Sequence, residues 1–216
     1  MIEFLVVVNK RDLWMRTQQQ LRFQANVKSF RILEGAQSIA DGYNRLAKES
    51  SADILCFCHQ DAELLFDVSV TIPGYVERLP QAGVFGFCGC DHLAPNTMWW
   101  VNAPRRGRMT WNGNDMNFGP LDSAVNDLRY HPVDAVDGYC IFIRHEVFDK
   151  VGGFDESIGG WHCYDLDLCI KCLKAGYQNY VIGQPSKHMG TSAEGSWLES
   201  LGRLAQKHGA FLAGKR

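Results

Sequence analysis

The sequence predicts an α/β fold with a mixed, mostly parallel sheet flanked by helices. Apolar runs typical of buried strands alternate with amphipathic segments through the first sixty residues, and strand patterns recur further along the chain. The chain has 216 residues, of which 46% are hydrophobic, so it can bury one sizeable core. We therefore expect a single domain over residues 1–216.

The alternation in the first sixty residues is regular. Ile2–Val8 is a continuous, mostly β-branched run, which is typical of a strand buried on both faces of a sheet. Ser38 followed by Asp41 forms a cap signal ahead of apolar residues at helical spacing. The expected elements are a strand at Ile2–Val8, a helix at 12–26, a strand at Ser29–Leu33, a helix after Ser38 and a strand at Asp53–Cys58. Right-handed crossovers would place these strands in one sheet, so residues 1–61 are expected to form a nucleotide-binding half.

The rest of the chain divides into a flap, a second half and a terminal helix. The segment 90–128 is rich in Gly, Asn, Pro and Trp, and we expect an irregular substrate-binding flap there. Its Trp99, Trp100 and Trp111 could offer stacking surfaces or could simply pack the flap down. The remaining expected elements are strands at Val84–Cys88, Tyr139–Ile143 and Tyr180–Ile182, a helix at 163–175 within an acceptor and catalytic half at 136–195, and a terminal helix at 196–213.

Composition excludes several classes of function. The net charge is −2 and no Lys/Arg run is present, so we expect no nucleic-acid partner. No apolar run is long enough to cross a bilayer, and the first apolar run leads into Lys10 and Arg11 without a cleavage site. These features favour a cytoplasmic protein with no transmembrane segment. Several of the eight cysteines lie inside apolar runs, so reduced core thiols are expected rather than disulfides.

Polar residues follow the third predicted strand at the edge of the sheet where α/β folds place their ligands. These residues are His59, Gln60 and Asp61. A carboxylate oxygen suits Mg²⁺ or Mn²⁺, whose other ligands a bound diphosphate can supply, so Asp61 is a candidate metal ligand. The alternative is a carboxylate that caps a helix or stabilises a turn.

A second group of carboxylates lies further along the chain. Asp137 and Gly138 precede a predicted strand and would enter the same region, or form a β-turn. Asp165 and Asp167 follow a glycine-rich approach to a helix. Residues two apart face nearly opposite sides of a helix, so one is expected to be catalytic and the other structural. Asp165 is the better candidate base, provided that burial or a second carboxylate offsets the helix N-terminus.

Histidine and cysteine add two further hypotheses. His188 follows a predicted strand and could complete a metal site with Asp61, in which case nitrogen ligation favours Mn²⁺ over Mg²⁺; it could equally be an exposed loop histidine. Two cysteine pairs with nearby polar residues permit a zinc site, although their spacing misses the usual knuckle. The residues concerned are Cys56, Cys58, Cys88, Cys90, His59, Asp91 and His92.

Taken together, these segments resemble GT-A glycosyltransferases of the family-two type, which have a Rossmann-like nucleotide-diphospho-sugar transferase fold. The resemblance is closest to a bacterial glycosyltransferase-like branch with His-Gln-Asp in place of Asp-x-Asp. It covers most of the chain and depends on the order and spacing of several short motifs. These motifs are Ser38–Asn44, Ile54–Asp61, Val136–Gly138, Gly153–Glu156, Tyr164–Leu168 and Pro185–His188.

The resemblance implies roles for individual residues. Asp61 matches the last Asp of the metal motif, His188 matches a late metal-ligand histidine, and Asp165 matches the Asp of the Glu-Asp catalytic motif. His59 stands in place of the first motif Asp, and Tyr164 in place of the Glu. The nucleotide-sugar site would include Asn9, Glu34, Asn44, His59, Gln60, Asp137 and Gly138, and the acceptor site Trp99, Trp100, Trp161 and His162.

The function implied by this resemblance is inverting transfer of a sugar from a nucleotide-sugar, with UDP-sugar as the favoured donor, to a glycan or lipid-linked acceptor. Mn²⁺ or Mg²⁺ would be the cofactor, and polysaccharide biosynthesis the setting. One alternative is a GT-A-like module that binds a nucleotide-sugar or glycan without turnover. A second is a nucleotidyltransferase, but the glycine-rich basic phosphate loop expected of that class is not seen near the first strand.

Overall fold

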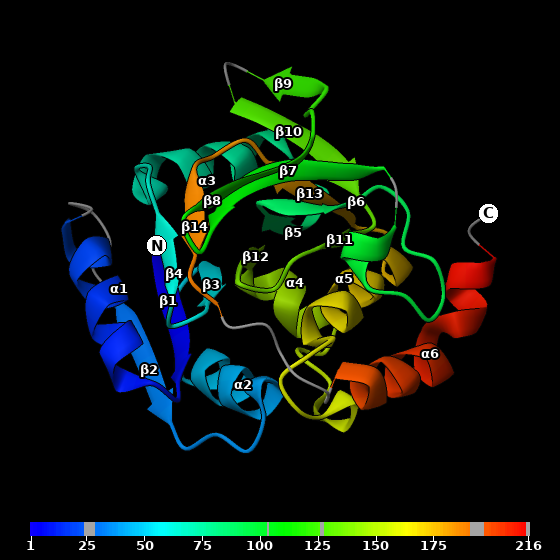
Figure 1. The fold of residues 1–216 in the computed structure, drawn as a ribbon, viewed down its shortest axis with the longest axis horizontal. Coiled ribbons are helices and arrows are strands. Elements are labelled where there is room, and N and C mark those ends of the chain that lie inside the picture. Colours follow the sequence, from blue (N-terminus) through cyan, green and yellow to red (C-terminus); the bar gives the residue numbers. More distant parts are fainter. Residues whose placement is uncertain (24–28, 103, 126–127, 191–196, 215–216) are drawn as a thin grey trace.

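The computed structural model describes residues 1–23, 29–102, 104–125, 128–190 and 197–214 (Figure 1). The helices are α1 Arg11–Phe23, α2 Ile39–Glu49, α3 Val68–Arg78, α4 His145–Lys150, α5 Tyr164–Lys174 and α6 Trp197–Ala213, with short 3₁₀ turns at Trp99–Val101 and Glu156–Ile158. The strands are β1 Ile2–Val8, β2 Phe30–Glu34, β3 Ile54–Cys58, β4 Ala62–Leu64, β5 Ala82–Gly86, β6 Cys88–Cys90, β7 Arg105–Trp111, β8 Asn114–Gly119, β9 Ser123–Val125, β10 Leu128–Val133, β11 Ala135–Val136, β12 Cys140–Arg144, β13 Gln178–Ile182 and β14 Ser186–His188.

The larger sheet has the strand order β2-β1-β3-β12-β5-β13-β10-β9. β1 pairs in parallel with β2 and β3, as the alternating pattern of the first sixty residues predicts. β12 starts at the carboxyl edge of β3, with Cys140 opposite Cys58, and therefore runs antiparallel to both β3 and β5. The expected mixed sheet flanked by helices is confirmed, although its parallel pairs are confined to β2-β1-β3 and β5-β13.

A second sheet, β11-β6-β7-β14-β4, takes in β7 from the segment 90–128, where an irregular flap was expected. β7 and β8 form an antiparallel hairpin in this segment, and β8 lies outside the main path of the sheet. The hairpin turns at Asn112 and Gly113, whose φ angles are 49° and 82°, as a two-residue type I′ turn requires. The predicted strand at Val84–Cys88 is likewise divided, because the chain passes from β5 in the first sheet to β6 in the second.

Most other expected elements are present with small shifts of their ends. Ser38 caps α2 by accepting a hydrogen bond from the Asp41 backbone N–H at 3.1 Å. The last residues of the helix expected at 12–26 lie outside the described part of the chain. α3 was not predicted; its buried Val68, Ile72 and Tyr75 follow at helical spacing. None of the described helices is long and apolar enough to cross a membrane.

The core lies between the larger sheet and the helices that cover it. β1, β3 and β12 are almost completely buried, and all eight cysteines are buried, as expected of core residues. Figure 1 shows α1, β1 and β2 at one side of the molecule and α5 with α6 at the other. The carboxyl end of β3 and the start of α5 both open onto the region between the two sheets, where the polar residues gather.

Candidate active site

Three side chains from two strand ends converge at the carboxyl edge of β3. His59 and Asp61 follow β3, and His188 ends β14, which pairs with β4 so that His188 lies opposite Ala62. His59 Nδ1 is 3.3 Å from His188 Nε2, and His188 Nε2 is 3.5 Å from Asp61 Oδ1. One ligand atom from each residue lies within 4.8 Å of the other two. The structure thus brings together Asp61 and His188, the pair expected to hold a metal, and adds His59.

This spacing fits a single divalent cation. Ligand atoms held at about 2.0–2.2 Å from one ion lie roughly 3–3.5 Å from their nearest neighbours, which matches both measured separations. Two imidazole nitrogens and one carboxylate oxygen form a donor set suited to Mn²⁺ and less suited to Mg²⁺. Within the described residues this is the one group of three or more potential ligands, and it contains no cysteine, so the predicted zinc site with thiolate ligands is not formed there.

Burial and mutual charge set the protonation states in this cluster. Burial and the neighbouring His188 lower the pKa of His59 to about 4, which keeps the imidazole neutral. Burial opposes the charges of Asp61 and His188, but their hydrogen bonding and attraction outweigh it. The pKa of Asp61 therefore lies below its ordinary value, and the pKa of His188 lies above. The charged forms of Asp61 and His188 thus stabilise each other, and the neutral imidazole of His59 lies beside them.

Gln60, between the two potential ligands that follow β3, turns towards the end of β1. Its Oε1 accepts hydrogen bonds from the backbone N–H groups of Asn9 at 2.9 Å and Lys10 at 2.7 Å. Its Nε2 donates to Asn9 Oδ1. These contacts fix the loop after β1 against the metal-capable cluster, so Asn9 and Gln60 shape the cleft as a pair.

Asp165 lies in the first turn of α5, beside Asp137. Burial and then the charge of Asp137 raise the pKa of Asp165 to about 7, against the lowering effect of nearby backbone N–H groups. Asp137 itself is held on both oxygens: Oδ1 accepts from the Tyr139 backbone N–H at 3.0 Å, and Oδ2 accepts from Trp99 Nε1 at 2.9 Å. The structure thus supplies both conditions, burial and a second carboxylate, that a base at this helix start requires.

We expect the rate of any reaction that uses Asp165 as a base to rise with pH and to level off above about pH 7. The carboxylate must be ionised to accept a proton, and its raised pKa means that below pH 7 the protonated form dominates. The measurement is kcat/KM between pH 5 and 9. A profile already flat from pH 5 upwards would contradict the raised pKa.

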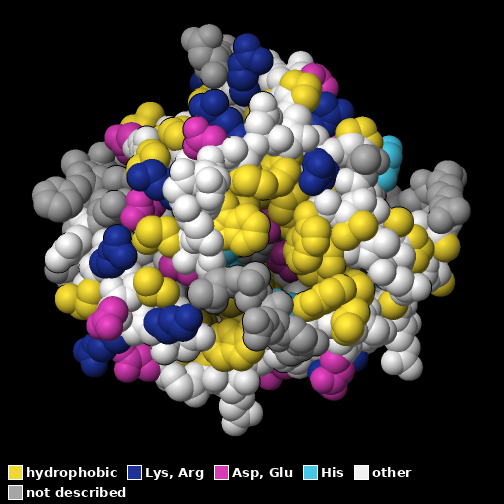
Figure 2. All heavy atoms as spheres, in the orientation of Figure 1, with side chains coloured by type: hydrophobic (Ala, Val, Ile, Leu, Met, Phe, Trp, Pro, Cys, Tyr) yellow, Lys and Arg dark blue, Asp and Glu magenta, His cyan; other side chains and the backbone are white. Residues whose placement is uncertain are grey.

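The cluster and Asp165 both line a cleft of about 1090 Å³. Figure 2 shows hydrophobic side chains gathered around a hollow, with acidic and histidine atoms visible inside it. Of the aromatic residues expected at the acceptor, Trp100 and Trp161 are 46% and 36% exposed, whereas Trp99 is buried and bound to Asp137. His162 also lines the cleft. Further lining residues, which the sequence motifs do not indicate, include Met98, Met109, Met116, Phe118, Arg105 and Trp197.

A smaller cleft of about 360 Å³ adjoins the first at the ends of β1 and β2. Asn9, Glu34 and Trp161 line it, and Asn9 and Trp161 line the larger cleft as well. Glu34 lies 3.9 Å from Arg11, and both side chains are well exposed. Polar groups at two neighbouring strand ends next to an aromatic ring suit a nucleoside.

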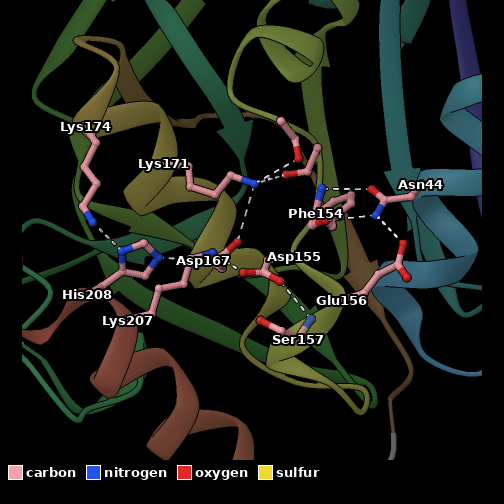
Figure 3. A network of polar contacts seen from close by, with 12 residues as sticks. Asn44, Phe154, Asp155, Glu156, Ser157, Asp167, Lys171, Lys174, Lys207 and His208 are labelled. Carbon is pink, nitrogen blue, oxygen red and sulfur yellow. Dashed lines mark hydrogen bonds and ion pairs between the residues drawn. The ribbon is translucent and has the colours of Figure 1, made fainter.

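Asn44, expected at the nucleotide-sugar, lies elsewhere in the structure. Its Nδ2 donates to the Phe154 backbone carbonyl at 2.9 Å and to Glu156 Oε1 at 3.0 Å, and its Oδ1 accepts from the Phe154 backbone N–H (Figure 3). All of these contacts hold the loop before α5 against α2, and Asn44 lines neither cleft. The polar groups of its side chain are therefore used in ordering this loop.

Comparison with known proteins assigns the family. The family model described as "Glycosyltransferase like family" matches residues 4–199. The chain belongs to this glycosyltransferase-like family. The match confirms the resemblance to glycosyltransferases and the expected glycosyltransferase class, whereas the branch with His-Gln-Asp stays a prediction. Solved glycosyltransferases share the fold: a crystal structure of GalNAc-T7 with UDP, GalNAc and Mn²⁺ has a TM-score of 0.66 at 11% identity and covers 95% of this chain and 47% of that chain.

Other similar proteins fit the same glycosyltransferase fold or match short segments. A mannosyltransferase from Pyrobaculum calidifontis in complex with GDP-Man and Mn²⁺ has a TM-score of 0.56 at 10% identity, over 89% of this chain and 58% of that chain. An uncharacterized protein of Sinorhizobium fredii is 47% identical over 45 residues, which are 21% of this chain and 5% of that protein. An uncharacterized protein of Mycobacterium bovis is 37% identical over 62 residues, 28% of this chain and 24% of that protein. This chain thus matches a small part of the two uncharacterized proteins and spans about half of the GalNAc-T7 and mannosyltransferase chains.

Proposed function

We propose that this chain transfers a sugar from a nucleotide-sugar to a hydroxyl group of an acceptor, with inversion at the anomeric carbon. The observation that supports the proposal is that the His59–Asp61–His188 cluster and Asp165 line the same cleft. A metal-capable cluster suits a diphosphate, and a buried carboxylate with a pKa of about 7 suits proton removal at neutral pH. The chain also belongs to a family described as glycosyltransferase-like, which supports glycosyl transfer as the reaction.

The donor would lie across the two adjoining clefts. Its nucleoside would occupy the smaller cleft beside Asn9 and Glu34, and its diphosphate would extend towards the metal-capable cluster. A UDP-sugar is the favoured donor because the similar GalNAc-T7 structure contains UDP, although the similar mannosyltransferase contains GDP-Man. Mn²⁺ is favoured over Mg²⁺ because two of the three potential protein ligands are nitrogens.

The transfer is a single displacement. The acceptor hydroxyl oxygen forms a bond to the anomeric carbon while the bond from that carbon to the diphosphate oxygen breaks, and the bonding pair leaves with the diphosphate. The hydroxyl proton passes to Asp165, which burial and Asp137 keep basic enough to accept it. A divalent cation held by the cluster would stabilise the negative charge that develops on the leaving diphosphate.

The aromatic residues around the larger cleft favour a glycan or lipid-linked acceptor. Trp100 and Trp161 expose flat apolar rings at its mouth, against which the apolar face of a sugar ring or a lipid chain can pack. Methionine side chains beside them adapt to irregular shapes. An acceptor of this kind fits a role in polysaccharide assembly.

Replacing Asp61 by Ala tests the proposal. We expect the variant to lose Mn²⁺-dependent binding of UDP-sugar, because the one carboxylate of the cluster and its pairing with His188 are removed. Titration calorimetry with and without Mn²⁺ measures this loss. Asp149→Ala is a matched control, because Asp149 lies on α4 with a 72% exposed side chain and lines neither cleft. Unchanged metal-dependent binding in Asp61→Ala would contradict the assignment.

Donor hydrolysis separates the transferase from a module that binds without turnover. We expect slow release of UDP from the donor in the presence of Mn²⁺, with water in place of the acceptor and Asp165 as its base. Wild-type protein that binds the donor tightly but never cleaves it, with any acceptor offered, would favour the binding module instead.

A further inference from the structure

Two residues that stand in place of acidic residues of the resembled family contact each other in this structure. Tyr164 Oη, at the start of α5, is 2.7 Å from His59 Nε2 and 2.8 Å from the Gly138 carbonyl oxygen. Tyr164 is 3% exposed, so water does not compete for these contacts. The tyrosine hydroxyl therefore links the backbone before β12 to an imidazole of the metal-capable cluster.

The direction of both hydrogen bonds follows from the groups involved. A backbone carbonyl can only accept, and a tyrosine hydroxyl has one proton to donate, so this proton goes to Gly138. The remaining contact must then be donated by the imidazole, which places the proton of His59 on Nε2. Burial raises the pKa of Tyr164 well above its ordinary value, so the hydroxyl keeps its proton.

The location of that proton decides which nitrogen of His59 can bind a cation. A neutral imidazole carries one N–H, so a proton on Nε2 leaves a lone pair on Nδ1. Nδ1 is the nitrogen that faces the cluster, 3.3 Å from His188 Nε2. We infer that Tyr164 is a positioning residue, which fixes the His59 tautomer so that the Nδ1 lone pair points at a divalent cation. The role of Tyr164 in cation binding rests on the proposed function, whereas the assignment of the His59 tautomer does not.

The packing around Tyr164 keeps its hydroxyl in this place. The rings of Tyr43 and Phe154 lie 5.9 Å and 5.5 Å from the Tyr164 ring, centroid to centroid. A Cβ atom added at Gly138 would lie 2.4 Å from Tyr164 Oη, so the absence of a side chain there permits the close approach. The hydroxyl is thus enclosed and aimed by its surroundings, as expected of an outer partner that orients a ligand.

Nitrogen NMR of metal-free protein tests the tautomer directly. With ¹⁵N-labelled histidine, long-range ¹H–¹⁵N correlations report which ring nitrogen carries the proton, and the His59 signals are assigned by their absence in His59→Gln. We expect the proton on Nε2 in the wild type and in Tyr43→Phe, and a shift of the proton towards Nδ1 in Tyr164→Phe. A proton on Nδ1 in the wild type, or an unchanged pattern in Tyr164→Phe, would overturn the inference.

Cation affinity tests the consequence. We expect Tyr164→Phe to bind Mn²⁺ about 10- to 100-fold more weakly, as measured by the electron paramagnetic resonance signal of free Mn²⁺. Tyr43→Phe is the matched control, because the Tyr43 hydroxyl is buried and has no hydrogen-bond partner among the described residues. Equal affinity in Tyr164→Phe and wild type, or an equal loss in both variants, would reject the positioning role. A wild type that binds no Mn²⁺ would refute the proposed function, while the NMR result would still decide the tautomer.

Discussion

Replacing Asp165 by Asn is expected to abolish sugar transfer while donor binding is retained. The amide keeps the shape of the carboxylate but cannot accept the acceptor proton, and a positioned general base typically contributes about 10²- to 10⁴-fold to a rate. The proposed donor contacts are made by the metal-capable cluster and the smaller cleft, so they are unaffected. Steady-state kinetics and titration calorimetry with UDP-sugar and Mn²⁺ measure the two properties separately.

The stability of the same variant provides an internal control. Folding raises the pKa of Asp165 from its ordinary 3.8 to about 7, so above pH 7 the ionised carboxylate opposes folding. Asp165→Asn should therefore melt at a higher temperature than the wild type at pH 8, and the difference should shrink as the pH falls from 7 towards 4. A variant that melts lower at pH 8, or that keeps its turnover, would contradict the role of Asp165 as a buried base.

The sequence predicted the elements whose signals are local. Ile2–Val8 forms β1 with the expected bounds, because a mostly apolar run rich in β-branched residues fits a strand buried on both faces. The cap at Ser38 forms with the Asp41 backbone, since it needs contacts only within four residues. The two-residue spacing of Asp165 and Asp167 also predicted that their side chains face different surroundings, because helix geometry alone places them on nearly opposite sides.

The second sheet was missed because its strands lack a clear apolar alternation. β7 and β8 are rich in Arg and Asn, and they are stabilised mainly by pairing with each other and with their neighbours. One signal was present: Asn112-Gly113 between two potential strands is the most favourable two-residue hairpin turn. α3 was missed because Val, Thr, Pro and Gly lower its helix propensity, and only the burial of its apolar face explains it.

The site shows a similar limit. Asp61 and His188 could be proposed together from motifs, whereas the hydrogen bond from His59 to Tyr164 joins residues 105 positions apart and carries no local pattern. Asn44 belongs to a motif that resembles a nucleotide-binding segment, yet its side-chain amide is hydrogen-bonded to the backbone of Phe154. Motifs indicate which residues gather at a site, but the partner of each polar group depends on tertiary packing.

Asp167, on the same helix as Asp165, is buried in a polar network with residues of α6 (Figure 3). Its side chain is 0% exposed, and its Oδ1 accepts hydrogen bonds from Lys207 Nζ and His208 Nε2, both at 2.7 Å. Lys174 Nζ lies 2.7 Å from His208 Nδ1; because a lysine ammonium can only donate, Nδ1 accepts and the ring proton is on Nε2. Asp167 thereby joins α5 to α6 without lining the larger cleft.

Replacing Asp167 by Ala is expected to destabilise the fold by about 3 kcal/mol, because it leaves the mostly buried Lys171 ammonium and the buried His208 N–H without their carboxylate partner. The lower end of the usual range applies because Lys207 is one-third exposed and keeps Asp155 as a partner. For a chain of this length the melting temperature should fall by roughly 6–12 °C, whereas Asp149→Ala, on the exposed face of α4, should change it little. Turnover per folded molecule should stay close to that of the wild type, because Asp167 lies on the opposite side of α5 from the cleft. Loss of turnover as severe as in Asp165→Asn, measured well below the melting temperature, would instead show that the α5–α6 junction takes part in catalysis.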